Sequence, residues 1–139
     1  MADEQHIKRI AIFGSTGSIG KQALEVIAAH PDKFSVEVLT AHHNDELLIR
    51  QAIQSNPNIV VIGDEQKYQK VKSALSSTHV KVFAGEDALE EVAGMDCYDM
   101  MLAAIVGYAG LESTISSIKA GKQIALANKE TLVVANVYC

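Results

Sequence analysis

Short apolar segments alternate with amphipathic segments about six times along this chain of 139 residues. The apolar, β-branched runs predict strands at residues 7–14, 34–41, 58–63, 81–84, 98–106 and 123–127. Between them, apolar residues at helical spacing predict helices at residues 18–30, 44–56, 65–76, 87–93 and 111–120, and a further element begins at 131–135. The almost continuous apolar runs at 58–63 and 98–106 are typical of parallel strands buried on both faces. The alternation therefore predicts an α/β fold with a doubly wound, mainly parallel sheet and helices on both faces.

Composition excludes several classes of protein. With 48% hydrophobic residues the chain has enough apolar surface for the core of one domain. A formal net charge of −5 disfavours binding to nucleic acid, and no apolar run approaches the roughly 20 residues that a membrane helix needs. Two cysteines cannot form a disulfide framework, and the polar, acidic start does not resemble a secretory signal. We therefore expect a cytoplasmic protein that binds neither nucleic acid nor membrane.

A glycine-rich turn joins the first predicted strand to the first predicted helix. Its sequence is GSTGSIG, residues 14–20, with G-x-x-G-x-x-G spacing rather than G-x-G-x-x-G. Glycine lets a ligand approach the backbone, and the amides of a first helical turn suit a pyrophosphate. No Gly-Lys-Ser/Thr follows, which argues against an NTPase phosphate loop. The turn predicts a Rossmann-type dinucleotide site at Gly14, Thr16, Gly17 and Ser18, whereas the alternative is a turn that serves only close packing.

The end of the second predicted strand indicates which dinucleotide would bind. An NAD site usually places an acidic residue there, but this chain has Ala41, His42, His43 and Asn44. The absence of a carboxylate favours NADP, and the two imidazoles and the amide can donate hydrogen bonds to a 2′-phosphate. Alternatively, the histidines are ordinary surface residues and Asn44 is a helix N-cap. A zinc site would need a third ligand that the sequence does not supply nearby.

Three polar residues follow the last clear strand. Asn128, Lys129 and Glu130 lie at a carboxyl strand end, where ligands bind in open α/β sheets. Taken alone, these residues favour a solvated loop with an acidic residue in a first helical turn over a ligand site. The final residues, 130–139, are still apolar and periodic, so we expect the natural molecule to continue.

Four segments together resemble one enzyme family, the 1-deoxy-D-xylulose 5-phosphate reductoisomerases. They are GSTGSIG (14–20), TAHHN (40–44), AAIVGYAGL (103–111) and AGKQIALANKETLV (120–133), and the resemblance runs from about residue 7 to residue 134. It implies that residues 1–139 form a single NADP-binding Rossmann domain. The family converts 1-deoxy-D-xylulose 5-phosphate to 2-C-methyl-D-erythritol 4-phosphate with NADPH and Mg²⁺ or Mn²⁺, in non-mevalonate isoprenoid biosynthesis. It also implies a cytoplasmic enzyme that is a homodimer at full length.

The resemblance assigns roles residue by residue. Thr16, Gly17, Ser18 and Ile19 fall on the family's pyrophosphate turn; His42, His43 and Asn44 fall on its 2′-phosphate contacts; Asn128 and Glu130 fall on cofactor contacts; and Lys129 falls on a substrate contact. Many members carry Gly-Lys-Asn where this chain has His42, His43 and Asn44, so the chain departs from the family pattern at His42 and His43.

The family's metal ligands, substrate phosphate site and flap follow the segment that this chain contains. We therefore expect an N-terminal fragment with no metal ligand or catalytic residue of its own, which is inactive alone. Two other readings remain: the cofactor domain of another NADP-dependent oxidoreductase, such as a semialdehyde or homoserine dehydrogenase, and a non-catalytic NADP(H)-binding module.

Overall fold

A computed structural model describes residues 7–104, 108–127 and 132–136, and within them the side chains of 7–104, 113 and 115–125. Its seven-stranded sheet has the order β4-β3-β2-β1-β5-β6-β7. The strands are β1 (Lys8–Phe13), β2 (Phe34–Ala41), β3 (Ile59–Ile62), β4 (Lys81–Ala84), β5 (Met100–Ala103), β6 (Gln123–Ala127) and β7 (Leu132–Asn136). Every neighbouring pair is parallel except β6 and β7, so the expected mainly parallel sheet is confirmed.

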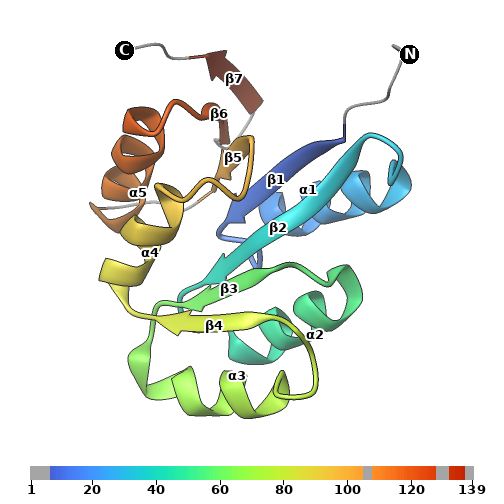
Figure 1. The fold of residues 1–139 in the computed structure, drawn as a ribbon, viewed down its shortest axis with the longest axis vertical. Helices are drawn as coiled ribbons and strands as arrows, with labels where there is room; N and C mark the ends of the chain where they lie inside the picture. Colours follow the sequence, from blue (N-terminus) through green and yellow to red (C-terminus); the bar gives the residue numbers. More distant parts are fainter. Residues whose placement is uncertain (1–6, 105–107, 128–131, 137–139) are drawn as a thin grey trace.

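Helices cover both faces of the sheet, as the alternation predicts (Figure 1). They are α1 (Ser18–Ala29), α2 (Asp45–Ser55), α3 (Tyr68–Ala74), α4 (Glu86–Ala93) and α5 (Tyr108–Lys119). One core cluster joins the sheet to α1, α2 and α3 through residues such as Leu48 and Val71, and a second joins it to α4 and α5 through residues such as Leu89 and Ile118. Strand order reverses at β1, which has β2 on one side and β5 on the other. The carboxyl end of β1 is therefore the switch point where ligands of such folds bind.

Two predicted elements are shorter than expected. The helix expected at residues 65–76 divides into a 3-10 turn, η1 (Glu65–Lys67), and α3, because the Asp64 carboxylate accepts a hydrogen bond from the Gln66 amide and tightens the chain there. Of the strand expected at 98–106, β5 forms over Met100–Ala103, and the backbone of Asp99 just before it still donates to the Arg9 oxygen and accepts from the Gln123 amide. Residues 105–107 lie outside the described chain.

A β-bulge interrupts the pairing of β1 with β2. Ile10 pairs with Val36 and Ala11 pairs with Val38, so Glu37 is one extra residue in β2. In a regular strand Val36 and Val38 would share a face. Here Val36 packs against the core cluster that joins the sheet to α1, α2 and α3, whereas Val38 belongs to the cluster that joins it to α4 and α5. The bulge therefore sets which residues of β2 face each layer of helices.

None of the helices described in 7–104 and 108–127 is long and apolar enough to cross a membrane.

Candidate dinucleotide-binding site

The glycine turn leaves β1 at its carboxyl end and is anchored to β2. Gly14 has a φ of 95°, which favours glycine because a Cβ is strained in that region. The Gly14 amide donates to the Thr40 backbone oxygen at 3.2 Å and to its Oγ1 at 3.0 Å, and the Ser15 amide donates to the same backbone oxygen at 2.8 Å. The turn therefore has a fixed position above the end of β1.

The amides that follow this anchored segment are available to a ligand. Within the described chain, the amides of Thr16, Ser18, Ile19 and Gly20 donate to no protein acceptor. Gly17 is the N-cap of α1 and has no side chain to occupy them, and the first turn of α1 contains no acidic residue. These unpaired amides coincide with the positive end of the helix dipole, so the arrangement fits a pyrophosphate.

Gly20 allows α1 to begin directly against the turn. A Cβ on Gly20 would lie 2.3 Å from the Gly14 oxygen and 2.6 Å from Ser15 Cα. By contrast, a Cβ on Gly17 would lie 3.9 Å from the Gly14 oxygen, which is an ordinary contact. The two glycines thus serve different purposes: Gly20 permits packing, and Gly17 lies exposed where the ligand would approach.

Two buried polar residues, Ser15 and Gln51, are hydrogen-bonded to each other and hold the turn in place. Ser15 Oγ donates to Gln51 Oε1 at 2.7 Å, and Gln51 Nε2 donates to the Ser15 oxygen at 2.9 Å. Ser15 is fully buried and Gln51 of α2 is 6% exposed. Gln51 is not among the residues that the sequence motifs predict for the site. The signal that could have indicated it is a polar residue at helical spacing beside the buried Leu48 and Ala52.

The two histidines lie exposed at the end of β2, beside the end of β3. The rings of His42 and His43 are in edge contact, with centroids 3.9 Å apart. His43 Nδ1 lies 3.4 Å from the Asp64 carboxylate. Gly63 makes room for His42, because a Cβ there would lie 2.4 Å from His42 Nδ1. The end of β2 itself carries no acid, as expected, but Asp64 brings a carboxylate to the same place from β3. The motif at the end of β2 does not predict this acidic neighbour.

Asn44 is the N-cap of α2, which is one of the two roles that the sequence predicts for it. Its Oδ1 accepts from the Leu47 amide at 3.2 Å. Since this uses only the oxygen of the side-chain amide, the NH₂ group can still donate to a ligand. Both readings of Asn44 are therefore compatible in the same geometry.

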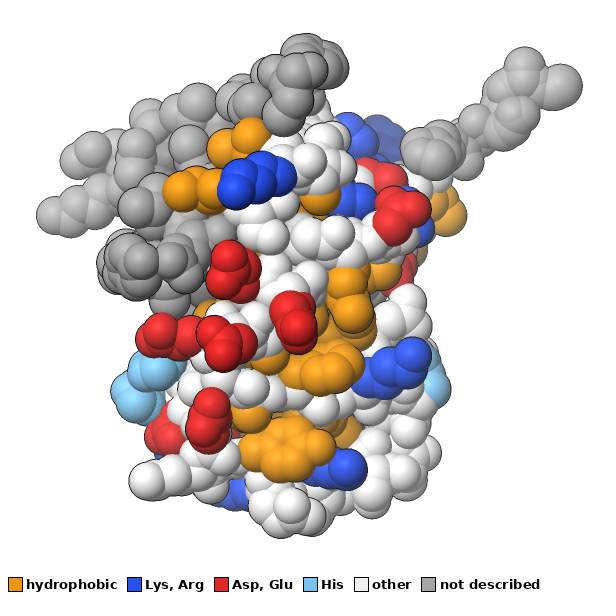
Figure 2. All heavy atoms as spheres, turned by 60° about the vertical axis from the view of Figure 1, so that its left-hand side comes forward, with side chains coloured by type: hydrophobic (Ala, Val, Ile, Leu, Met, Phe, Trp, Pro, Cys, Tyr) orange, Lys and Arg blue, Asp and Glu red, His pale blue; other side chains and the backbone are white. Residues whose placement is uncertain are grey.

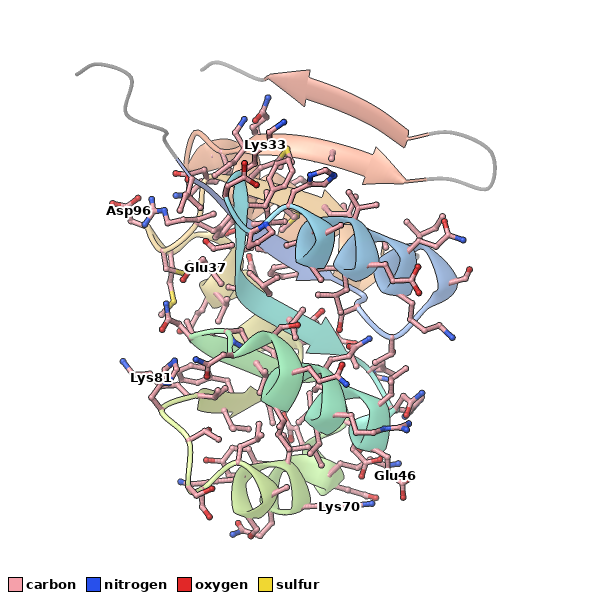
Figure 3. All side chains as sticks on the ribbon, turned by 90° about the vertical axis from the view of Figure 1, so that its right-hand side faces the viewer. Lys33, Glu37, Glu46, Lys70, Lys81 and Asp96 are labelled. Carbon is pink, nitrogen blue, oxygen red and sulfur yellow. The ribbon has the colours of Figure 1, made fainter. Side chains whose placement is uncertain are left out.

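A charge cluster follows Asn44. Asp45, which is 6% exposed, lies 3.2 Å from Lys70 Nζ and 3.7 Å from Lys67 Nζ. Burial by itself would raise the pKa of Asp45, but the hydrogen bond from Lys70 and the charge of Lys67 outweigh it, and the pKa is lowered. Lys70 also lies 3.5 Å from Glu46, and the two side chains meet between α2 and α3 (Figure 3). Both lysines already have acidic partners, so they are not free counter-ions for a phosphate.

The rest of the described surface offers less to a phosphate. On the face that carries α4, acidic side chains gather beside exposed apolar ones (Figure 2), and Glu86, Asp87, Glu90 and Glu91 of α4 are all exposed. In the part of the chain that the structure describes, no three histidine, cysteine or acidic residues are grouped so as to hold a metal ion. The predicted contacts Asn128, Lys129 and Glu130 lie outside the described residues.

Comparisons with known proteins agree on one family. Residues 10–136 match the family model described as 1-deoxy-D-xylulose 5-phosphate reductoisomerase. The chain is 58% identical over 128 residues to the enzyme of that name from Phocaeicola vulgatus, covering 92% of this chain and 34% of the relative. It is 52% identical over 128 residues to that from Porphyromonas gingivalis, covering 92% and 33%. The chain thus spans about a third of the length of these relatives.

Solved structures show the same fold. The reductoisomerase from Zymomonas mobilis in complex with NADPH superposes with a TM-score of 0.84 at 41% identity, over 90% of this chain and 33% of that one. A second reductoisomerase, in complex with NADPH, fosmidomycin and magnesium, gives 0.83 at 33% identity, over 89% and 31%. Since the family model spans nearly the whole sequence and the fold matches, the chain belongs to the 1-deoxy-D-xylulose 5-phosphate reductoisomerase family.

Proposed function

We propose that residues 1–139 form one NADPH-binding domain, which supplies the cofactor part of a 1-deoxy-D-xylulose 5-phosphate reductoisomerase. The observation that carries the proposal is the set of unpaired amides at Thr16, Ser18, Ile19 and Gly20, at the switch point of a parallel sheet. Related structures at 41% and 33% identity are described as NADPH complexes.

The residues divide between the two phosphate-bearing ends of the cofactor. Gly14 and Gly17 let the pyrophosphate approach the backbone, and the amides of Thr16, Ser18 and Ile19 bind it. The Ile19 side chain packs toward the core, so its contribution is through the backbone. At the other end His42, His43 and the Asn44 NH₂ group donate to the 2′-phosphate. The Asp64 carboxylate lies 3.4 Å from His43 Nδ1, so its negative charge opposes that of the phosphate at this end of the site.

In the complete enzyme, we propose, Asn128 and Glu130 contact the cofactor and Lys129 contacts the phosphosugar substrate. NADPH, when bound, supplies the hydride that reduces the rearranged sugar. The product is 2-C-methyl-D-erythritol 4-phosphate, an isoprenoid precursor, and the enzyme is a cytoplasmic homodimer that requires Mg²⁺ or Mn²⁺. The residues described here provide no ligand group for that metal, so no step is assigned to it in this chain.

A titration with NADPH and NADH tests the cofactor proposal. The chain contains no tryptophan, so the fluorescence of bound reduced nicotinamide can be followed without transfer from that residue. We expect NADPH to bind at least about tenfold more tightly than NADH, which corresponds to about 1.4 kcal/mol. Equal affinity, or no binding of either dinucleotide, contradicts the proposal.

Asn44→Asp is the sharpest variant for this purpose. Aspartate caps a helix as well as asparagine does, so the stability of α2 is retained, but the NH₂ donor becomes a carboxylate. We expect the preference for NADPH over NADH to fall by about tenfold with an unchanged melting temperature. An unchanged preference would place the 2′-phosphate elsewhere.

Turnover is a separate question, because the chain spans about a third of its relatives. We expect purified chain to bind NADPH but not to consume it when 1-deoxy-D-xylulose 5-phosphate and Mg²⁺ are added. Loss of absorbance at 340 nm above the rate without protein would show that the chain alone is catalytic.

A further inference from the structure

The two polar groups of one buried side chain both act on the glycine turn. Gln51 accepts from Ser15 Oγ at 2.7 Å through Oε1 and donates to the Ser15 backbone oxygen at 2.9 Å through Nε2. Ser15 and Gln51 are 36 positions apart, and both are buried. A buried amide that forms two hydrogen bonds to a single residue fixes that residue in position as well as in orientation.

Ser15 is the residue through which this constraint reaches the unpaired amides. On one side of it, the Gly14 and Ser15 amides donate to Thr40 of β2. On the other side, Thr16 provides the first unpaired amide. The first turn of α1 rests on the same residue, because a Cβ on Gly20 would lie 2.6 Å from Ser15 Cα. The backbone of Thr40 and the side chain of Gln51 therefore hold the turn from two directions.

The helix that carries Gln51 also carries the other end of the candidate site. Asn44 caps α2 at its start, and Gln51 lies two turns further along the same helix. The hydrogen bonds of Gln51 thus tie α2 directly to the glycine turn. Side-chain contacts of this kind, which orient groups that bind a ligand, affect affinity without touching the ligand.

We infer that Gln51 is a positioning residue for the cofactor's pyrophosphate, acting through Ser15. The inference rests on the proposed NADPH-binding function. Gln51 has no direct contact with the dinucleotide in this assignment; it sets the place of the Thr16 amide and of the first turn of α1. Loss of the Gln51 side chain should therefore weaken the binding of ligands that contain the pyrophosphate. The binding of ligands that contain only the 2′-phosphate end should not change.

The test compares Gln51→Met with Gln54→Met in the 139-residue chain. Methionine has nearly the volume of glutamine and forms neither hydrogen bond, and Gln54 is an exposed residue of the same helix. Dissociation constants are measured for NADPH, by nicotinamide fluorescence, and for adenosine 2′-monophosphate, by the shifts of the His42 and His43 imidazole protons. We expect Gln51→Met to raise the constant for NADPH about tenfold, as the loss of two hydrogen bonds predicts, and to leave that for adenosine 2′-monophosphate within about twofold. Gln54→Met should leave both within about twofold.

Ser15→Ala provides a second variant if Gln51→Met does not fold. It removes the contacts of Ser15 Oγ with Gln51 Oε1 at 2.7 Å and with the Thr40 oxygen at 3.2 Å, and it retains the backbone oxygen that accepts from Gln51. We expect about a threefold weaker affinity for NADPH. In a folded variant, unchanged NADPH affinity overturns the inference, and so does an equal loss for both ligands, which would indicate a general effect on the fold. If unaltered chain does not bind NADPH at all, the proposed function fails, and this inference fails with it. Unaltered binding by the variants contradicts the inference alone.

Discussion

Replacing Gly20 by alanine tests how closely α1 must approach the glycine turn. The added Cβ would lie 2.3 Å from the Gly14 oxygen and 2.6 Å from Ser15 Cα. Both are backbone atoms, and both belong to a segment that is hydrogen-bonded to β2 and to Gln51. Contacts of a Cβ below 3.0 Å are essentially never seen, so α1 and the turn would have to separate by at least about 0.7 Å.

Two opposing effects determine the change in stability. Overpacking of this kind costs about 1–3 kcal/mol, whereas alanine stabilises a helical position by about 0.5–1 kcal/mol relative to glycine. Because rigid backbone surrounds the site, we place the cost near its upper limit and expect the free energy of unfolding to fall by about 2 kcal/mol. For a domain of this size, that corresponds to a melting temperature lower by about 6–10 °C.

The melting temperatures of Gly20→Ala and Gly17→Ala are measured by circular dichroism, and the affinity for NADPH is measured on the same samples. Gly17 has a φ of −77° and room for a Cβ at 3.9 Å, so Gly17→Ala should melt within about 2 °C of the unaltered chain. Gly20→Ala should melt earlier and also bind NADPH more weakly, because the amides of α1 are displaced. If Gly20→Ala melts at or above the temperature of the unaltered chain, the reasoning from close packing is wrong.

Two further predictions concern pH. Burial raises the pKa of Tyr98 from 10.0 to about 12, although its hydrogen bond with Ser117 acts in the opposite direction. The stability that depends on the neutral form of Tyr98 is complete below pH 10 and is lost as pH rises toward 12. We expect Tyr98→Phe to be less stable than the unaltered chain at pH 8 by about 1 kcal/mol. Between pH 8 and pH 11.5, however, the free energy of unfolding measured by urea titration should fall less for Tyr98→Phe than for the unaltered chain. The pKa of Asp45 is lowered, so its contribution is present above its ordinary value of 3.8 and is lost as pH falls below it. Asp45→Asn should therefore be less stable than the unaltered chain at pH 7, and the difference should shrink by pH 3; a constant difference would contradict the ion pairs with Lys67 and Lys70.

Features that depend on neighbours in the sequence could be predicted. The alternation of strands and helices is local, and so is the glycine turn, where Gly14 adopts a positive φ. The N-cap role of Asn44 needs only the amide three residues later. These features account for the fold class and for the place of the glycine turn.

Features that depend on pairing across the fold could not be predicted with the same reasoning. The contact of Gln51 with Ser15 depends on which face of α2 is turned toward the sheet, and the packing of Leu48 and Ala52 in the core determines that orientation. Glutamine in a helix is otherwise typical of a surface. The contact was therefore found only in three dimensions.

The neighbour of His43 was missed for a different reason. The 2′-phosphate site proposed from the sequence includes only the end of β2, but β3 is parallel to β2 and ends beside it. Asp64, just after β3, therefore reaches His43 at 3.4 Å. Parallel pairing of consecutive strands was itself predicted, so the proximity of these two strand ends could have been included. The roles of Asn128, Lys129 and Glu130 stay predictions.

Because Glu37 is the extra residue of the bulge, we expect β2 to tolerate the loss of one residue at this position. The Glu37 carboxylate, labelled in Figure 3, accepts from Ser35 Oγ at 3.0 Å and also from the Asn58 side chain. Glu37 lies in the first half of β2, whereas the glycine turn is bonded to Thr40 near the end of the strand. Removing this single residue would place Val38 directly after Val36, in the register that the two halves of the strand already have against β1. Thr40 would keep its place beside Phe13 and its bonds to Gly14 and Ser15. We therefore expect that homologous chains can differ by one residue at this point while the end of the sheet that carries the glycine turn retains its geometry.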